Sequence, residues 1–329
     1  MSDGIPPGVE EAAKQRAAAR ADRDWATADR LRTEIETAGW RVIDSGTAYR
    51  LAPASPPDVQ VGGEIRYGRS EAVPSRLEEA SIGLASVVVV VSADSEQTRR
   101  ALDGLASSAP AGIDVVLVAD GLSDRALEPL GAWRRGADED PDADVPVPTE
   151  LVRTSEPLGH AAAVNVGIRR ARAAVVVVLD PSIVPGGDVV TPLVRALDDD
   201  TVAIASPFGL RSTDLRRFDE VLAATGPVDA AAVQGYLMAF RRSDAAARGP
   251  LDEGFRFYRN LDIWWSLVLR DEGPDRPPRR AVVVPGLDLE RGQPRAWTTT
   301  APAERDRLSK RNFYRILDRF RGRSELAVG

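Results

Sequence analysis

Short apolar runs alternate with helix-like segments through the middle of the chain, and this pattern most constrains the fold. The runs occupy residues 86–91, 114–119, 173–180 and 201–206, and the helical patterns occupy 96–107, 125–135, 161–172 and 189–197. Runs this short, rich in valine and apolar throughout, are typical of strands buried on both faces. Strands that alternate with helices pair in parallel, with the helices covering the sheet. The sequence therefore predicts an α/β fold with a mostly parallel sheet flanked by helices.

Polar side chains follow the predicted strands where each strand ends. Ser92 and Asp94 follow the first run, Asp120 follows the second, and Asp180 and Ser182 close the third. Ligands of open α/β sheets bind at the carboxyl ends of the strands. We therefore expect a binding site at this edge of the sheet. The segment after the first run has no glycine-rich dinucleotide or P-loop pattern.

The composition excludes several kinds of catalysis. The chain has no cysteine, one histidine (His160) and two lysines (Lys14 and Lys310). Thiolate nucleophiles and multi-histidine zinc sites are excluded, and a Schiff-base lysine has little room. Any chemistry must depend on carboxylates, hydroxyls, arginines and backbone amides.

Charge and hydropathy indicate a cytoplasmic protein that is not a general nucleic-acid binder. The net charge is −7, whereas phosphate neutralisation needs a basic surface. The longest apolar runs, 87–91 and 173–179, are far short of the ~20 residues that span a bilayer, and residues 1–11 lack a signal-peptide pattern. Residues 304–323 form a basic amphipathic helix pattern, with eight basic and three acidic residues. This helix either docks on the main domain or provides peripheral contact with a membrane surface or RNA.

The amino-terminal region has a different pattern from the rest. Trp25, Ala28, Leu31 and Ile35 recur at helical spacing, an alanine-rich stretch precedes them, and residues 40–51 read as a strand hairpin. Prolines and glycines between 53 and 80 indicate a linker without regular structure. Residues 138–144 form an acidic loop, read as a solvated excursion because it lacks a calcium-type spacing.

Four separated blocks between about 86 and 284 resemble family 2 glycosyltransferases of the GT-A fold. They are SVVVVVSADSEQTRRALDGL, VVLVADGLSD, GHAAAVNVGIRRARAAVVVVLD and QGYLMAFRRSDAAARGPLDEGFRFYRNLDIWWSL. Their order and spacing make the combination specific. The resemblance implies a GT-A-like domain at 81–290, preceded by a helical hairpin appendage at 1–52 and a linker at 53–80. Residues 291–329 then form a carboxyl-terminal helical region.

The resemblance also implies roles for particular residues. Asp262 is expected to take the proton from the acceptor hydroxyl, and its apolar helix would raise its proton affinity. The nucleotide would bind at Ser92, Asp94, Asp120 and Asn165. The sugar would contact Trp264, Trp265 and Glu253. The partner is a nucleotide-sugar donor, and the acceptor is a glycan, a lipid or a protein.

The metal site that the resemblance implies is incomplete. Asp180-Pro181-Ser182 stands where the family has an Asp-x-Asp pair, and residues 290–293 contain no histidine. Three alternatives remain open. Mg²⁺ or Mn²⁺ is held by Asp180 with weak help from Ser182 and the diphosphate, Arg291 or Arg295 neutralises the diphosphate, or the fold only binds.

The amino-terminal segment AARADRDWATADRLRTEIETAGWRVIDSGTAYRL is similar to the carboxyl-terminal tail of cysteinyl-tRNA synthetases. It either docks on the main domain, pairs with a second copy of the chain in a homo-oligomer, or contacts RNA.

From the four blocks between about 86 and 284, we expect a glycosyltransferase that uses a nucleoside diphosphate donor with inversion. The alternatives are a catalytically inactive GT-A-like binding protein and an RNA-associated factor.

Overall fold

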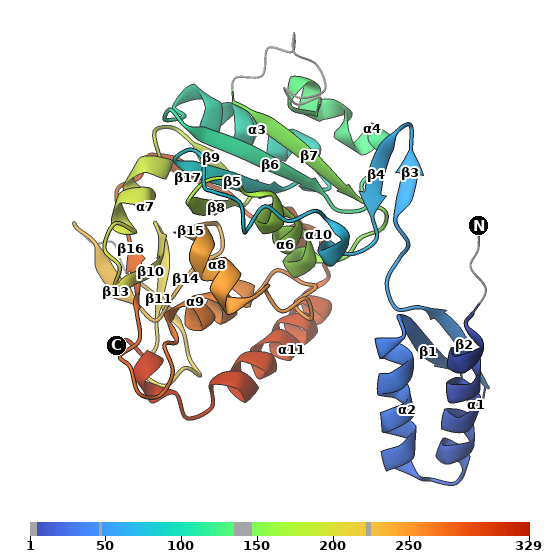
Figure 1. The fold of residues 1–329 in the computed structure, drawn as a ribbon. Coiled ribbons are helices and arrows are strands. Elements are labelled where there is room, and N and C mark those ends of the chain that lie inside the picture. Colours follow the sequence, from blue (N-terminus) through green and yellow to red (C-terminus); the bar gives the residue numbers. More distant parts are fainter. Residues whose placement is uncertain (1–4, 46–47, 135–146, 222–224) are drawn as a thin grey trace. The chain divides into compact units, whose positions relative to one another are not determined.

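The computed structural model describes residues 5–45, 48–134, 147–221 and 225–329 (Figure 1). The chain divides into two compact units, Met1–Arg69 and Ser70–Gly329. The boundary between them falls inside the segment predicted as a linker. The acidic loop at 138–144 lies outside the described residues.

The amino-terminal unit contains the predicted helical hairpin. Helices α1 (Pro7–Ala21) and α2 (Trp25–Thr37) are followed by an antiparallel pair, β1 (Trp40–Ser45) and β2 (Ala48–Pro53). The side chain of Asp24 caps α2 by accepting a hydrogen bond from Thr27 N at 3.1 Å. Leu31 and Ile35 are buried in a small core with residues of α1. Leu31 and Ile35 of the predicted spacing thus make core contacts, whereas Trp25, which was counted in the same pattern, is 58% exposed.

The segment expected to lack regular structure contains a short hairpin. Strands β3 (Val59–Val61) and β4 (Glu64–Tyr67) pair antiparallel. Gly62 and Gly63 both have positive φ, 59° and 89°, and form the turn between them. The glycines were read as breakers, but between two alternating strands they are the residues that a tight hairpin turn requires.

The second unit is built on a mixed, mostly parallel sheet, as predicted. Its strands lie in the order β13-β16-β10-β15-β8-β5-β6-β7. Their bounds are β5 (Ala85–Val90), β6 (Ile113–Ala119), β7 (Thr149–Thr154), β8 (Val175–Leu179), β10 (Val202–Ser206), β13 (Val228–Ala230), β15 (Leu237–Arg241) and β16 (Arg280–Val283). β5 is parallel to both β6 and β8, whereas β15 runs antiparallel to its neighbours β8 and β10. The carboxyl ends of β5, β6 and β8 therefore meet at one edge.

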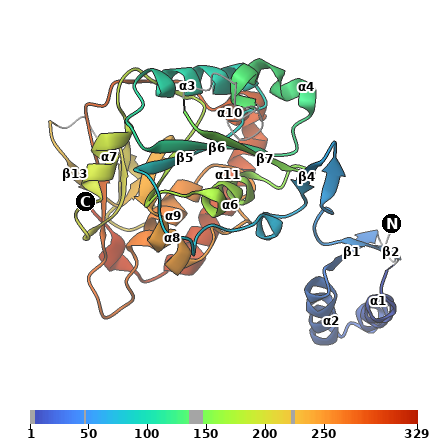
Figure 2. The ribbon, with the colours of Figure 1, turned by 45° about the horizontal axis from the view of Figure 1, so that its top comes forward.

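Helices cover both faces of this sheet. They are α3 (Ser95–Ser107), α4 (Asp124–Leu127), α6 (His160–Arg170), α7 (Val190–Ala196), α8 (Arg242–Arg248), α9 (Leu261–Arg270), α10 (Arg295–Thr299) and α11 (Pro302–Phe320), with 3₁₀ turns η1 (Ser70–Ala72), η2 (Glu128–Arg134) and η3 (Ser324–Leu326). Figure 2 shows α3 and α4 on one side of β5–β7, with α6, α8 and α9 on the other. The valine runs are consequently buried on both faces, which explains why they lack polar alternation.

Two minor sheets complete the unit. One contains β11 (Gly209–Arg211), β12 (Asp219–Glu220) and β14 (Ala232–Val233). The other pairs β9 (Ile183–Pro185) with β17 (Leu289–Arg291), and Gly292 N donates to Ser182 O at 2.8 Å. This second pair ties the chain directly after Asp180 to the segment that leads into α10.

The basic helix α11 packs against α9. Its buried side chains include Ile316 and Phe320, which belong to the apolar face recognised in the sequence. Docking on the main domain is therefore the structural role of this helix. In the described part of the chain, no helix combines the length and apolar character needed to cross a membrane.

Candidate functional site

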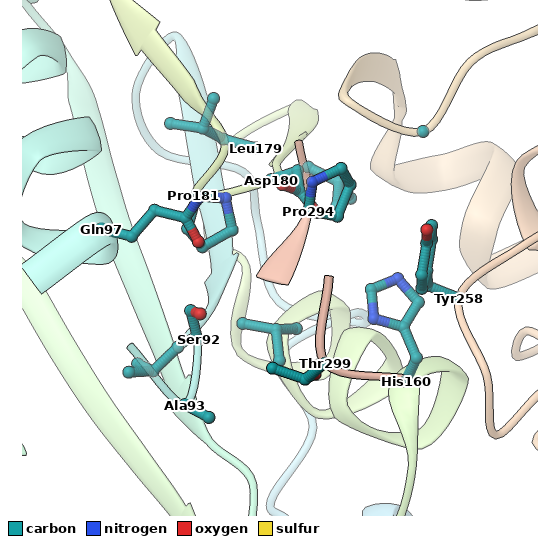
Figure 3. Close-up of a pocket in the computed structure, with 14 residues that line it drawn as sticks. Ser92, Ala93, Gln97, His160, Leu179, Asp180, Pro181, Tyr258, Pro294 and Thr299 are labelled. Carbon is teal, nitrogen blue, oxygen red and sulfur yellow. The ribbon is translucent and has the colours of Figure 1, made fainter. Parts of the chain in front are cut away.

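A first cavity opens at the carboxyl ends of β5 and β8 and has a volume of about 260 Å³. Its wall includes Val90, Val91, Ser92, Ala93, Gln97, His160, Val178, Leu179, Asp180, Pro181, Gly235, Tyr258, Pro294 and Thr299. Figure 3 shows His160 and Tyr258 together on one side, facing Ser92, Ala93 and Gln97 on the other. The cavity is thus at the sheet edge where the sequence predicted a binding site.

A second cavity of about 520 Å³ adjoins the first. The two share the wall residues His160, Asp180, Gly235, Tyr258 and Pro294. The wall of the second also includes the charged or polar residues Arg216, Glu220, Gln234, Arg259, Asn260, Asp262 and Gln293 and the apolar or aromatic residues Leu210, Phe218, Tyr236, Met238, Leu261, Ile263, Trp297 and Phe313. Two ligands bound in these cavities would therefore meet beside Asp180.

Asp180 lies at the junction because it directly follows the buried strand β8. Its Oδ1 accepts a hydrogen bond from Ser182 N at 2.8 Å, which closes a tight turn. Burial raises the pKa of the Asp180 carboxyl, and the hydrogen bond from Ser182 opposes this only in part. Ser182 itself is 4% exposed and lines neither cavity.

The side chains around Asp180 do not fit a metal site made of protein ligands. Within the described ranges, no group of three or more His, Asp or Glu side chains is placed to hold a metal ion. Asp180 is the only carboxylate in the wall of the first cavity. Gly292, whose N–H donates to the backbone oxygen of Ser182, has no side chain that could bind a metal ion. A Mg²⁺ ion here would have one protein carboxylate and would draw its remaining oxygens from the diphosphate and water.

Asp262 lies in the first turn of α9 and faces the second cavity. Its Oδ2 accepts from Gly235 N at 2.8 Å, and its Oδ1 accepts from Ile263 N at 2.9 Å. Burial raises the pKa of Asp262, whereas these bonds and the positive charge of Arg259 lower it to a smaller extent. The carboxylate is thus oriented by backbone donors, has a raised proton affinity and lies beside open space.

His160 and Tyr258 lie at the junction and Tyr236 lines the second cavity, although the predicted site did not include them. Burial lowers the pKa of His160 to about 4, so its ring is neutral at pH 7. The ring meets Tyr258 edge-on, with centroids 6.2 Å apart. Burial raises the pKa of Tyr258 to about 12. All three are neutral hydrogen-bonding groups.

Ser92 lines the first cavity as expected, but Asp94 and Asp120 line neither cavity. Asp94 is exposed before α3. Asp120 accepts hydrogen bonds from Thr154 Oγ1 at 2.9 Å, Leu158 N at 2.7 Å and Gly159 N at 3.0 Å. Its carboxylate therefore holds the turn that starts α6, rather than pointing freely at a ligand.

Asn165 and Glu253 are hydrogen-bonded to each other and line neither cavity. Asn165 is 2% exposed; its Nδ2 donates to Leu251 O and Glu253 Oε1, each at 2.9 Å, and its Oδ1 accepts from Leu251 N at 2.9 Å. Glu253 also accepts from Ser70 Oγ. These side chains join α6 to the segment before α9, and they do not meet the other predicted site residues.

The two tryptophans of α9 are part of the core. Trp264 is 5% exposed and Trp265 0%, and the Trp265 ring packs edge-on against Phe240. Their faces are therefore not open to a sugar ring in this structure.

The guanidinium of Arg291, predicted to neutralise the diphosphate, contacts other side chains of the protein instead of a cavity. Its guanidinium lies over the Phe208 and Tyr236 rings, donates to Gln234 Oε1 at 3.4 Å and is 3.9 Å from Glu220. It does not line either cavity. The side chain of Arg295 lies outside the described part of the structure.

Comparison with family models identifies two regions. Residues 86–227 match the model of glycosyl transferase family 2, and residues 2–49 match the model of the cysteinyl-tRNA ligase anticodon binding domain. Both resemblances expected from the sequence motifs are confirmed.

Two curated cysteine–tRNA ligases match a short part of the chain. A cysteine–tRNA ligase 1 from Burkholderia lata is 44% identical over 59 residues, which are 17% of this chain and 13% of that protein. A cysteine–tRNA ligase from Opitutus terrae is 46% identical over 50 residues, 15% of this chain and 11% of that protein. The chain thus spans only a small part of the length of these relatives.

Among solved structures, the chain is similar to GalNAc-T7 with UDP, GalNAc and Mn²⁺. The TM-score is 0.56 at 18% identity, covering 72% of this chain and 48% of that one. The mannosyltransferase PcManGT from Pyrobaculum calidifontis, in complex with GDP-Man and Mn²⁺, gives a TM-score of 0.46 at 19% identity, covering 76% and 77%. The likeness to the first of these proteins, with its TM-score of 0.56, shows that the chain has the GT-A fold, and the chain spans about half the length of that protein.

Proposed function

We propose that this protein transfers a sugar from a nucleoside diphosphate donor to an acceptor hydroxyl, and the match of residues 86–227 to the model of glycosyl transferase family 2 supports this. One observation carries the proposal: two adjoining cavities meet at Asp180, and Asp262 faces the second of them. This arrangement matches a reaction that must bring two substrates together beside a carboxylate base.

The donor nucleotide binds in the first cavity, against Ser92 and Gln97 at the end of β5. Its sugar and diphosphate reach the junction, where His160 and Tyr258 offer neutral hydrogen-bonding groups and the backbone of Gly235 forms part of the wall. The acceptor enters through the second cavity, whose wall combines aromatic rings such as Trp297 with charged side chains such as Glu220 and Arg259, a lining that suits the face and the hydroxyls of a sugar ring.

Transfer then proceeds with Asp262 as the base. Its carboxylate takes the proton from the acceptor hydroxyl, and the acceptor oxygen forms a bond to the anomeric carbon. The bond from that carbon to the phosphate oxygen breaks on the opposite face, and its electron pair leaves with the diphosphate. Attack from the opposite face inverts the anomeric centre. The raised pKa of Asp262 makes it a stronger base than an exposed aspartate.

A screen for hydrolysis or transfer over common UDP- and GDP-sugars tests this function. Asp262→Asn is expected to lower turnover by about 10²- to 10⁴-fold, since a positioned base contributes that much. Donor binding, measured by calorimetry with UDP and GDP, should persist. Asp306→Asn is a matched control, because Asp306 is exposed on α11. Unchanged turnover in Asp262→Asn would refute the mechanism; nucleotide binding with no turnover for any donor would favour the inactive binding protein.

A second candidate function, RNA contact, is favoured by the match of residues 2–49 to an anticodon binding domain model. Within the described part of this unit, however, several arginines are already paired with carboxylates: Arg16 and Arg20 with Asp44, Arg30 with Glu34, and Arg32 with Glu36. A gel shift with tRNA at low salt decides the matter, because phosphate binding weakens steeply as salt rises. No shift at 50 mM salt would leave docking or pairing with a second copy as the role of this unit.

A further inference from the structure

The sugar transfer proposed at the junction of the two cavities requires a positive charge beside the diphosphate. Asp180 and Asp262 both line the second cavity, and the proposed donor brings a diphosphate to the same place. A departing diphosphate must be neutralised for the bond to the sugar to break easily. Among the described residues, no group of three or more carboxylates or histidines could hold a metal ion to supply this charge, so a metal would depend mainly on the diphosphate itself.

Arg259 is the cation best placed to do so. It lines the second cavity, directly follows Tyr258, whose side chain lines both cavities, and lies near enough to Asp262 to influence its charge. Among the described residues, its guanidinium has no hydrogen-bond or ion-pair partner; its contact is the face of Trp297, with Cζ 4.8 Å from the ring centroid. Stacking fixes the plane of the guanidinium and leaves its N–H groups available.

Helix α11 holds the backbone of Arg259 in place. Asn312 is 2% exposed, and its Nδ2 donates to Phe257 O at 2.9 Å and to Arg259 O at 2.7 Å. The next residue, Asn260, has a left-handed φ of 68° and donates from Nδ2 to Ser309 O at 2.9 Å. A non-glycine residue rarely adopts that region unless its surroundings favour it, and the bonds to α11 help to hold the turn.

The same helix holds the stacking partner. Arg305 places its Cζ 4.0 Å from the centroid of the Trp297 ring and donates from Nη1 to Trp297 O at 3.0 Å. Both the backbone of Arg259 and the ring under its side chain are thus anchored to α11. The other arginine in the wall of the second cavity, Arg216, is exposed on a loop and lacks such support.

We propose that Arg259 binds the diphosphate of the donor through paired N–H groups and supplies the positive charge that a metal ion would otherwise bring, at a site where Pro181-Ser182 provides no second metal-binding carboxylate. This rests on the proposed function. As the bond between sugar and phosphate breaks, its electron pair moves onto the phosphate oxygen, and the guanidinium stabilises that charge without exchanging a proton. Asn312 acts as a positioning residue that sets where the guanidinium lies.

The test is calorimetric titration of the full chain with UDP and GDP, in EDTA and in Mn²⁺, together with uridine and guanosine, which lack phosphate. The wild type should bind one of the diphosphates equally well, within about twofold, in both buffers. Arg259→Gln should weaken that binding roughly 10- to 100-fold, the range for charge-assisted hydrogen bonds, and leave nucleoside binding unchanged. The diphosphate affinity of Arg259→Lys should lie between those of the wild type and Arg259→Gln, because lysine keeps the positive charge but lacks the planar pair of N–H donors.

Two further variants make the result specific. Arg311→Gln removes the same charge from an exposed position on α11 and should bind like the wild type. Asn312→Asp keeps the side-chain shape, loses both donated hydrogen bonds, and should weaken diphosphate binding more than nucleoside binding.

Three outcomes overturn the inference: a wild type that binds diphosphates only with Mn²⁺, an Arg259→Gln variant that binds UDP or GDP as tightly as the wild type, or an equal loss for nucleoside and diphosphate. Binding to neither diphosphate by the wild type would reject the proposed function along with it. Metal-dependent binding would reject the role of Arg259 alone and leave the proposed function standing.

Discussion

Replacing Asn165 by alanine separates a structural role from a nucleotide-binding role. The sequence motif assigned Asn165 to the nucleotide, whereas the structure places it in the interior, with three hydrogen bonds to Leu251 and Glu253. Asn165→Ala removes the side-chain partner of each bond and leaves the Leu251 N–H, the Leu251 carbonyl and one carboxylate oxygen of Glu253 without it.

The size of the effect follows from these bonds. The two neutral hydrogen bonds to Leu251 contribute about 1 kcal/mol each, and the bond to the charged Glu253 contributes about 1.5–3 kcal/mol. We therefore expect the free energy of unfolding to fall by about 3–5 kcal/mol. For a domain of about 150–250 residues, that corresponds to a decrease in Tm on the order of 10 °C.

The assay combines thermal unfolding, followed by tryptophan fluorescence, with UDP and GDP titration at a temperature where the variant is still folded. A structural role predicts a large loss of stability and unchanged nucleotide affinity. Asn165→Asp should be at least as destabilising, because it loses both donated bonds and brings a second negative charge to Glu253. A Tm within about 2 °C of the wild type, together with a tenfold loss of nucleotide affinity, would refute this reasoning.

Three further predictions concern charge and packing around the junction. Asp180→Asn keeps an oxygen for the bond from Ser182 but removes a buried charge; because the folded pKa of Asp180 is raised, its ionisation destabilises the fold as pH rises above ~4. At pH 7 the free energy of unfolding of the variant should exceed that of the wild type by on the order of 1 kcal/mol, and this gain should disappear below pH ~4. Thermal melts measure the difference, and a variant less stable than the wild type would contradict the burial of the Asp180 charge. His160, the only histidine, should show an NMR signal that does not titrate between pH 5 and 8. Its contribution to stability should be lost as pH falls from ~6.5 toward about 4. A titration midpoint near 6.5 would show that the imidazole ring is exposed to solvent. Gly167→Ala places a Cβ 2.1 Å from Val88 Cγ1, so overpacking of about 1–3 kcal/mol should outweigh the helix-propensity gain of about 1 kcal/mol, and a raised Tm would show that β5 can yield.

The fold could be predicted because each element has a local signal. Fully apolar valine runs require burial on both faces, and the segments between them repeat at helical spacing. The hairpin β3–β4 was missed because glycine permits a turn as readily as it ends a structure. Only the pairing of Val59–Val61 with Glu64–Tyr67, a contact between strands, distinguishes the two cases.

The site was predictable at the level of position but less so for individual side chains. Asp180 and Asp262 line one cavity, as expected from strand ends and a helix start. Asp120 carries an equally good motif, yet its carboxylate is occupied by Leu158 and Gly159 amides. A sequence shows which carboxylates follow strands, but not which backbone donors will claim them.

Arg259 was missed for a related reason. Nothing in its immediate neighbours distinguishes it from other arginines, and its position depends on Asn312 and Trp297, which lie far along the chain. Contacts at that separation become visible only when α11 is seen against the loop before α9.

The wall that the two cavities share has a consequence for inhibitor chemistry. A compound that joined a nucleoside to an apolar group through a short linker would pass His160, Asp180 and Tyr258 on its way from one chamber to the other. Since the chambers adjoin, such a linker need span only a few atoms, and the second half would bind at a high effective concentration. Bisubstrate ligands should therefore bind this protein far more tightly than either half alone.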